Sequence, residues 1–180
     1  MNNAQALILS LARRHAPQAD AVLEVGCGRS RFLPVVASRY PAAQLTGIDN
    51  SQRAIETQSR QSEPRITYVL SAIEHTPFDD GSFDVALACK SFHHWSGKQQ
   101  GLDELARLLR PGGVAVIADP FTDGPLRHEW FNRLNEAIDG GKFTHVEDFR
   151  RMCGRAGLSI VDKEFVPGSA KTMSAFVIAK

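Results

Sequence analysis

Residues 21–30, AVLEVGCGRS, decide the fold that we expect for this chain. A short apolar run, interrupted by the single carboxylate of Glu24, leads into Gly26 and Gly28, and a second apolar run covers residues 32–37. Two apolar runs around a glycine turn predict a buried strand, a tight loop and a helix. Glycine has no Cβ and lets a ligand approach the backbone, and the first turn of the helix directs unpaired N–H groups at the same place. The stretch therefore predicts a site for a nucleotide-like ligand at the end of the strand.

The composition is that of a single soluble domain. The chain has 180 residues, of which 43% are hydrophobic and 23% are charged, and its formal net charge is +1. This length supports one domain with a real core, and the small net charge provides no strong field for nucleic acid or an anionic membrane. The three cysteines lack metal-type spacing, and no apolar run could span a bilayer. We expect one cytoplasmic domain over residues 1–180, with reduced thiols and without nucleic-acid, membrane or metal partners; the oligomeric state stays open.

Strand and helix patterns alternate along the chain. The predicted strands are the apolar runs at residues 22–25, 44–49, 66–70, 83–89, 114–119, 158–166 and 172–179. The predicted helices lie at about residues 4–15 (within an N-terminal segment, 1–19), 32–39, 51–60, 102–110, 127–138 and 144–153. Alternation implies a parallel sheet with helices on both faces, and the short link between the last two strands requires that they be antiparallel.

Five features in this order resemble those of the class I S-adenosylmethionine-dependent methyltransferases. They are VLEVGCGRSRF (22–32), GIDNS (47–51), SAIEHTPFDDGSFDVALACKSFHHW (71–95), RLLRPGGVAVIADP (107–120) and the terminal pair of strands. The likeness extends over about residues 21–180 and is greatest to the small, type 11-like members that methylate metabolites. It implies a Rossmann-like three-layer αβα sandwich, in which a seven-stranded, mostly parallel sheet has an antiparallel last strand.

The resemblance implies that S-adenosylmethionine binds at the carboxyl ends of the strands. Asp49 ends a predicted parallel strand, where its carboxylate would accept hydrogen bonds from the ribose hydroxyls. Ile73 would offer its backbone N–H to adenine. The usual third loop glycine is Ser30 here, and Ala72 replaces the usual acid that receives the adenine amino group, so this contact would come from backbone, from Glu74 or from water. The predicted cofactor-binding residues are Glu24, Gly26, Gly28, Asp49, Asn50, Ala72, Ile73 and Cys89.

No single catalytic residue is implied, because a sulfonium methyl donor is already activated. We expect the protein chiefly to orient a small-molecule acceptor and to exclude water, with a base only where the acceptor loses a proton. The candidate acid–base groups are His94 and His128, with Lys90 as a third, and His94 is also compatible with a structural or cofactor-shell role. Neighbouring side chains of an extended segment point apart, so His93 and His94 do not predict a metal site.

A segment at residues 120–143 is the predicted cover of the acceptor site, because long connections after a parallel strand commonly cover substrates. The segment and its flanks contain aromatic, proton-accepting and glycine residues at Phe121, Gly124, His128, Glu129, Trp130, Phe131, Gly140, Gly141, Phe143 and His145. The alternative is an ordinary surface helix.

Two other functions stay open. A nicotinamide-dependent oxidoreductase would have glycine at position 31, which is Arg31 here, and would not predict the Pro-Gly-Gly turn or the final antiparallel pair. A cofactor-binding protein without catalysis, acting through a partner, is compatible with the missing acid at Ala72 and with the compact chain. Turnover with a panel of acceptors would separate such a protein from an enzyme.

Overall fold

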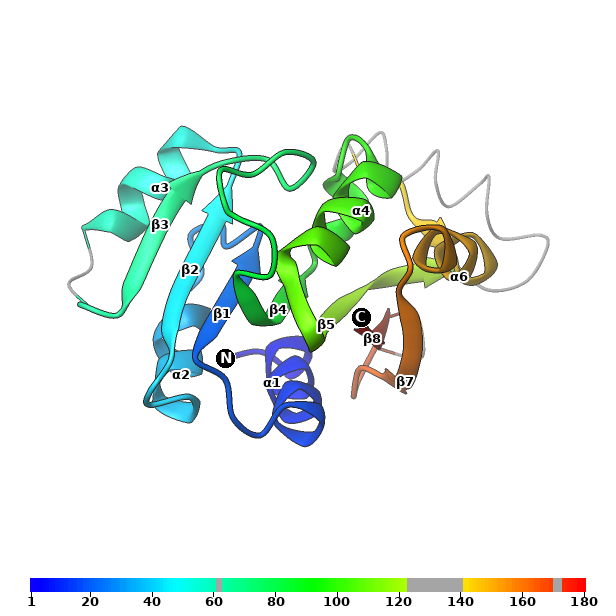
Figure 1. Cartoon of the computed structure of the whole chain (residues 1–180), viewed down its shortest axis with the longest axis horizontal. Helices are drawn as coiled ribbons and strands as arrows, with labels where there is room; N and C mark the ends of the chain where they lie inside the picture. Colours follow the sequence, from blue (N-terminus) through cyan, green and yellow to red (C-terminus); the bar gives the residue numbers. More distant parts are fainter. Residues whose placement is uncertain (61–62, 123–140, 170–172) are drawn as a thin grey trace.

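A mixed β-sheet forms the middle layer of the molecule (Figure 1), whose computed structural model describes residues 1–60, 63–122, 141–169 and 173–180. The strands are β1 (Ala21–Val25), β2 (Gln44–Asp49), β3 (Ile66–Leu70), β4 (Phe83–Cys89), β5 (Leu109–Thr122), β6 (Thr144–His145), β7 (Ser159–Phe165) and β8 (Met173–Ala179). The order across the sheet is β3-β2-β1-β4-β5-β8-β7, and the two-residue β6 pairs with β5 off this path. Only β8 runs antiparallel to its neighbours in this order, β5 and β7, which confirms the predicted fold class.

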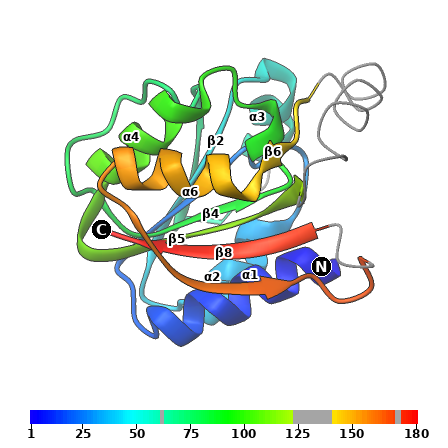
Figure 2. The ribbon, with the colours of Figure 1, turned by 90° about the vertical axis from the view of Figure 1, so that its right-hand side faces the viewer.

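Helices cover both faces of the sheet (Figure 2). They are α1 (Asn3–His15), α2 (Phe32–Arg39), α3 (Gln52–Ser59), α4 (Lys98–Leu108) and α6 (Val146–Arg155), with a 3-10 turn, η1, at Phe92–His94. One core lies between the sheet and α1 and α2, and a second lies between the other face and α4 and α6. Because side chains alternate along a strand, each central strand contributes apolar residues to both cores. Among the described helices, none is both long and apolar enough to cross a bilayer.

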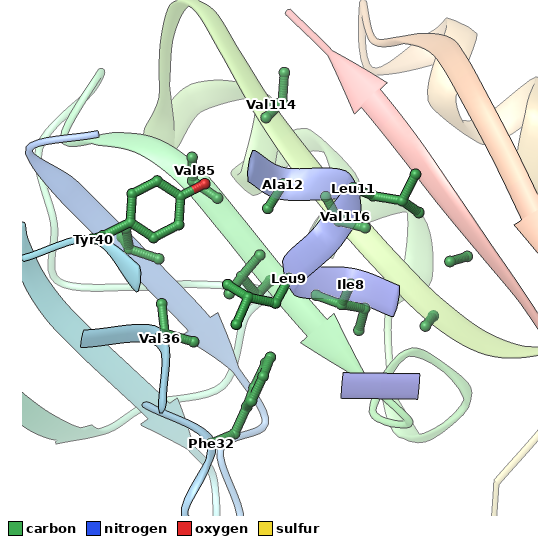
Figure 3. Packing of buried hydrophobic residues seen from close by; sticks show 14 of the residues in the cluster. Ile8, Leu9, Leu11, Ala12, Phe32, Val36, Tyr40, Val85, Val114 and Val116 are labelled. Carbon is green, nitrogen blue, oxygen red and sulfur yellow. The ribbon is translucent and has the colours of Figure 1, made fainter. Parts of the chain in front are cut away.

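Helix α1 is built into the first core by its apolar face. Ile8 and Leu11 are fully buried, and they belong to the same core cluster as Val85 of β4 and Val116 of β5 (Figure 3). The Asn2 side chain caps the helix by accepting a hydrogen bond from the backbone N–H of Gln5, in a reciprocal capping box. The N-terminal helix is therefore part of the domain core.

The Pro-Gly-Gly stretch differs from the prediction. The helix expected over residues 102–110 runs from Lys98 to Leu108, and β5 already begins at Leu109. Leu109 pairs with Phe83 and Val114 pairs with Val85, so residues 110–113 form an irregularity in the strand rather than a turn before it. Extended backbone at Leu109 ends the helix. The helix predicted at 127–138 lies outside the described residues.

Asp84 joins three segments at the amino end of the sheet. Its Oδ2 accepts hydrogen bonds from the backbone N–H groups of Asp20 and Ala21 at 2.8 and 2.9 Å, and its Oδ1 accepts one from Arg110 Nη1 at 2.8 Å. Burial acts to raise the pKa of this carboxyl, but the backbone N–H groups and the Arg110 guanidinium outweigh it and lower the pKa from its ordinary value. Asp84 thus fixes the start of β1 against β4 and the irregular part of β5.

We expect Asp84→Asn to destabilise the protein by about 1–3 kcal/mol at pH 7, because charge-assisted hydrogen bonds are lost. A carboxyl whose pKa is lowered by folding stabilises the protein above its unfolded pKa, about 3.9, and this contribution is lost as the pH falls through the folded value. The difference in the free energy of unfolding between the variant and the wild type should therefore become smaller from pH 7 to pH 3. Urea unfolding at both pH values measures it. Asp79→Asn, an exposed carboxylate, is the control, and equal stability of Asp84→Asn and wild type at pH 7 would contradict the assignment.

Candidate functional site

A cavity of about 300 Å³ lies at the carboxyl edge of β1, β2, β3 and β4. It is lined by residues that end these strands or follow them: Val25, Gly26, Gly28, Ile48, Asp49, Asn50, Ser71, Ala72, Ile73, Glu74, Lys90, Ser91, His94, Trp95 and Ser96. Parallel strands bring their carboxyl ends to one edge, which is where open α/β sheets bind ligands. Six of the eight predicted cofactor-binding residues meet on this wall; Glu24 and Cys89 do not.

The loop after β1 requires glycine for two different reasons. Gly26 has a φ of +72°, and a Cβ on it would lie 2.4 Å from Cβ of Ser91, so the backbone passes directly against the loop after β4. Gly28 has a φ of +54°, but no atom lies within 4 Å of a Cβ built there. The first glycine permits close packing within the protein, whereas the second leaves open space on the cavity wall.

Asp49 holds this loop from the end of β2. Its Oδ2 accepts a hydrogen bond from the backbone N–H of Gly28 at 2.8 Å, and its Oδ1 accepts one from the N–H of Ser51 at 2.9 Å. Ser51 in turn caps α3 by accepting a hydrogen bond from the N–H of Ala54, as the sequence predicts. Each carboxylate oxygen can accept a further hydrogen bond. Asp49 is therefore part of the loop's own structure and still has acceptor capacity for a ligand.

Glu24 lies behind the glycine loop and is only 3% exposed. Burial, together with the nearby charge of Asp49, raises the pKa of its carboxyl well above the ordinary value. None of the hydrogen bonds among the described residues involves this carboxyl. A buried acid without a donor is costly in its ionised form, and this cost is what raises the pKa of Glu24.

Cys89 is expected to face the cofactor through its backbone, and this stays a prediction because only its side chain is turned away from the cavity. It ends β4, but its side chain packs against the core under α1 and α2 instead of lining the cavity. Burial raises the pKa of its thiol to about 12. The alternation of side chains along β4 explains the difference, because residue 89 faces α1 while Lys90 and Ser91 turn to the cavity.

The cavity wall near β3 combines apolar and polar groups. Ile73 and Trp95 are buried there, and a Cβ on Gly101 of α4 would lie 2.6 Å from Trp95 Cε3, so the indole packs directly on the helix. Within the described part of the chain, the buried indole N–H of Trp95 has no hydrogen-bond partner. Ala72 is exposed, and Glu74 uses one oxygen to accept a hydrogen bond from the N–H of Gly97 at 2.9 Å. This wall suits a flat ring with acceptor nitrogens.

The two histidines do not point apart as the sequence predicted. They lie in the tight turn η1 rather than in an extended segment, and their ring centroids are 3.9 Å apart. His94 lines the cavity, whereas His93 is buried and its Nδ1 lies 2.8 Å from Oδ1 of Asp119. In the described residues, no three His, Cys, Asp or Glu side chains form a group that could hold a metal ion.

Asp119 is a residue that sequence reasoning missed. It ends the apolar run of β5 and is fully buried; burial raises the pKa of its carboxyl, while the bonds from His93 act to lower it. A carboxylate at the end of a buried parallel strand is the same signal that identifies Asp49, and β5 lies next to β4 in the sheet. Its partner His93 could not be identified from the spacing along the chain.

The predicted acceptor cover is described only at its two ends. Phe121 is a core residue whose ring packs against those of Phe92, Phe149 and Phe176, and it is not a wall of an open site. His145 is the N-cap of α6, where its Nδ1 accepts a hydrogen bond from the N–H of Glu147 at 3.2 Å. The remaining described residues are Gly141, which packs against the two histidines, and Phe143, whose ring lies 5.8 Å from that of His93. Gly124, His128, Glu129, Trp130, Phe131 and Gly140 lie outside the described residues.

Comparisons with known proteins agree with this geometry. The model of a family described as a methyltransferase domain matches residues 23–117, more than half of the chain. The chain is 29% identical over 150 residues to the O-methyltransferase cnsE of Penicillium expansum, covering 81% of this chain and 54% of that protein. It is 31% identical over 152 residues to the methyltransferase GfsG of Streptomyces halstedii, covering 78% and 53%. The chain thus spans about half the length of these two relatives.

A solved structure shows the same fold. It is the structure of geranyl diphosphate C-methyltransferase from Streptomyces coelicolor A3(2) in complex with Mg²⁺, geranyl diphosphate and S-adenosyl-L-homocysteine. The two structures superpose with a TM-score of 0.81 at 15% sequence identity, over 97% of this chain and 82% of that chain. At this identity the likeness is one of fold alone. Together with the order of the motifs and the strand order, the family match establishes that this chain belongs to the class I S-adenosylmethionine-dependent methyltransferases.

Proposed function

We propose that the cavity binds S-adenosylmethionine and that the protein transfers its methyl group to a small-molecule acceptor. The observation that carries the proposal is the arrangement of Gly28 and Asp49, in which an open glycine backbone and a carboxylate with spare acceptor capacity face one cavity at the ends of β1 and β2. The family assignment supports the same cofactor.

The residues present fit the parts of this cofactor. Asp49 would accept hydrogen bonds from the ribose hydroxyls, and the backbone around Gly26 and Gly28 would receive the amino-acid end. Ile73 and the indole of Trp95, which both line the cavity, would cover the adenine faces. Asn50 and Ala72 complete the rim. Glu24, behind the loop, would have a supporting role near the amino end of the cofactor.

When bound, S-adenosylmethionine supplies an activated methyl group on a sulfonium. The chain's own task is then to hold an acceptor in line and to exclude water. His94 stands on the cavity wall and could accept a proton from an acceptor that must lose one, while the buried His93–Asp119 pair fixes the turn that carries it. His128 remains a candidate for the same role within residues 120–143, the proposed acceptor cover.

We also propose that residues 1–180 act as one domain in the cytoplasm. Cys27, Cys89 and Cys153 are all free in the structure, and burial raises the pKa of each thiol, which suits a reducing compartment.

The deciding experiment has two stages. Calorimetry with S-adenosylmethionine and S-adenosylhomocysteine tests binding, and release of S-adenosylhomocysteine with a panel of phenol, amine, thiol and carboxylate acceptors tests turnover. Absence of binding would overturn the proposal. Binding without turnover across the panel would favour a non-catalytic binding protein that acts through a partner.

Asp49→Ala should weaken S-adenosylhomocysteine binding about a hundredfold, because two charge-assisted hydrogen bonds to ribose would be lost. It should also destabilise the protein, since the N–H groups of Gly28 and Ser51 lose their acceptor. Asp49→Asn keeps an acceptor oxygen and should cost about tenfold in affinity with less effect on stability. Calorimetry and thermal unfolding measure both, with Asp79→Asn as the control. Wild-type affinity in a folded Asp49→Ala protein would mean that the ribose is held elsewhere.

Ala72→Asp should strengthen cofactor binding about fivefold, since it adds an acceptor for the adenine amino group. Ala72 is exposed on the cavity wall, so the new carboxylate would not need to be buried. An S-adenosylhomocysteine analogue with hydrogen in place of the adenine amino group should show no gain. An equal gain for both ligands would refute the placement of adenine beside residue 72.

Glu24→Gln should stabilise the free protein at pH 8. Folding raises the pKa of Glu24, so the wild-type protein becomes less stable as the pH rises above the pKa of this group in the unfolded chain, about 4.3. The free energy of unfolding falls by about 1.4 kcal/mol for each pH unit between the unfolded and the folded pKa. The glutamine cannot ionise and escapes this loss, and its advantage should vanish near pH 4. Urea unfolding at pH 4, 6 and 8 measures the trend, with exposed Glu56→Gln as the control; a gain independent of pH would contradict it.

A further inference from the structure

A second cavity, of about 400 Å³, lies beside the first at the same edge of the sheet. Its walls are the start of α1 at residues 2–4, the link between β7 and β8 at residues 166–169, and Met173. Met173 pairs with Pro120, so this cavity adjoins the carboxyl end of β5. Lys90, directly after β4, lines both cavities. Lys90 therefore borders both cavities.

The walls of the second cavity are fixed to one another without a ligand. At one end of α1, the Asn3 side-chain amide donates a hydrogen bond to the carbonyl oxygen of Pro167 at 3.0 Å. At the other end, Arg14 forms an ion pair with Glu164 at 2.6 Å, and His15 Nε2 lies 2.9 Å from Asp162. Each exposed pair contributes little alone, but together they hold the helix along β7. The cavity is thus a preformed feature of the fold.

Lys90 is the charged group of this cavity. Its backbone φ is +56°, which makes it the single non-glycine residue with positive φ among the described residues, and its N–H donates to the carbonyl oxygen of Ala118 at 2.8 Å. A side chain in this conformation has an energetic cost that the surrounding structure must offset. The cost is incurred at the residue that borders both cavities.

The polar side chains around Lys90 are already engaged. Asn2 caps α1, Asn3 binds Pro167, and Ser169 Oγ donates to the carbonyl oxygen of Val166 at 2.7 Å. Lys90 is exposed, and none of the ion pairs and side-chain hydrogen bonds among the described residues involves its ammonium. On the described wall of the second cavity it is also the sole charged side chain, and the positive end of the α1 dipole lies beside it. Val166 and Met173 supply apolar surface.

We propose that the second cavity is the methyl-acceptor site and that it selects acceptors in which an apolar body carries a carboxylate, paired with the ammonium of Lys90. This inference rests on the proposed function. With adenine beside Ala72 and Ile73 and ribose at Asp49, the amino-acid end of the cofactor lies toward β4, the side on which Lys90 stands. One ammonium balances a single negative charge, which favours a carboxylate over a phosphate dianion.

The body of the acceptor would lie in the second cavity. Its nucleophilic oxygen or nitrogen would reach past Lys90 toward the cofactor in the first cavity. That atom forms a bond to the methyl carbon as the carbon–sulfur bond breaks. The bonding pair passes to sulfur, which becomes a neutral thioether, and the acceptor's proton leaves to water or to a base such as His94. Lys90 acts here as a binding residue for the carboxylate and takes no part in the bond changes.

The test uses benzoate and its neutral analogue benzamide as probes of the whole protein saturated with S-adenosylhomocysteine. Amide chemical shifts of the ¹⁵N-labelled protein should move for residues 3, 4, 90, 168 and 169 at millimolar benzoate, and much less with benzamide. Lys90→Gln should weaken benzoate binding about fivefold, as expected for one ion pair near the surface. Lys90→Arg should retain it, and Lys163→Gln, which removes an exposed lysine of β7, should leave it unchanged. Affinity for S-adenosylhomocysteine should stay unchanged in Lys163→Gln, and in Lys90→Gln it should fall by less than the affinity for benzoate.

Several results would overturn the inference. Equal shifts with benzoate and benzamide, no shifts at all, or shifts elsewhere would remove the carboxylate site. A loss of S-adenosylhomocysteine affinity in Lys90→Gln as large as the loss for benzoate would assign Lys90 to the cofactor's own carboxylate. Wild-type protein that fails to bind S-adenosylhomocysteine would overturn the proposed function and this inference together, whereas cofactor binding without a benzoate site would overturn this inference alone. The amide spectrum of each variant also reports whether it is folded.

Discussion

The carboxylate of Asp49 is the interaction on which the site depends. It accepts one hydrogen bond from the loop after β1 and one from the residue that caps α3, so a single side chain at the end of β2 fixes two neighbouring segments. The main-chain carbonyl of Ile48 reinforces this by accepting hydrogen bonds from the N–H groups of Gly26 and Cys27 at 2.8 and 3.0 Å. A ligand that binds Asp49 therefore meets a backbone already held in place, and little ordering entropy remains to be lost on binding.

The same arrangement has a cost in stability. Glu24 is buried, and besides this burial the nearby charge of Asp49 raises the pKa of the Glu24 carboxyl. Two carboxyl groups in this space cannot both ionise without mutual repulsion, and only Asp49 has N–H donors to stabilise its charge. A fold selected for stability alone would have an apolar residue at position 24. Buried groups that lower stability are typical of functional sites in proteins.

The sequence was sufficient to predict the features that follow from local apolar patterns and from the rule that parallel strands end at one edge of an α/β sheet. Apolar runs located the strands, and because parallel strands end at one edge, the sequence alone places Gly26, Asp49 and Ile73 together. It was insufficient where distant segments decide. The pairing of Leu109 with Phe83 extended β5 through the Pro-Gly-Gly stretch, and His93 found its partner in Asp119, 26 residues further along the chain. Local spacing does not contain these contacts.

The carboxyl edge of the sheet has two parts, one expected to bind the cofactor and one proposed to bind the acceptor. From β3 to β1 the wall consists of groups expected to hold the cofactor, and Trp95 joins them from the turn after β4. The wall of the second cavity is built by Lys90, residues 166–169 after β7 and the start of α1, which meet only in the folded chain. Among the described lining residues the two cavities have Lys90 in common, so the second can change its charge and shape while most of the first stays intact. The acceptor is therefore to be identified from the side chains beyond β4 and not from the motifs that identify the family.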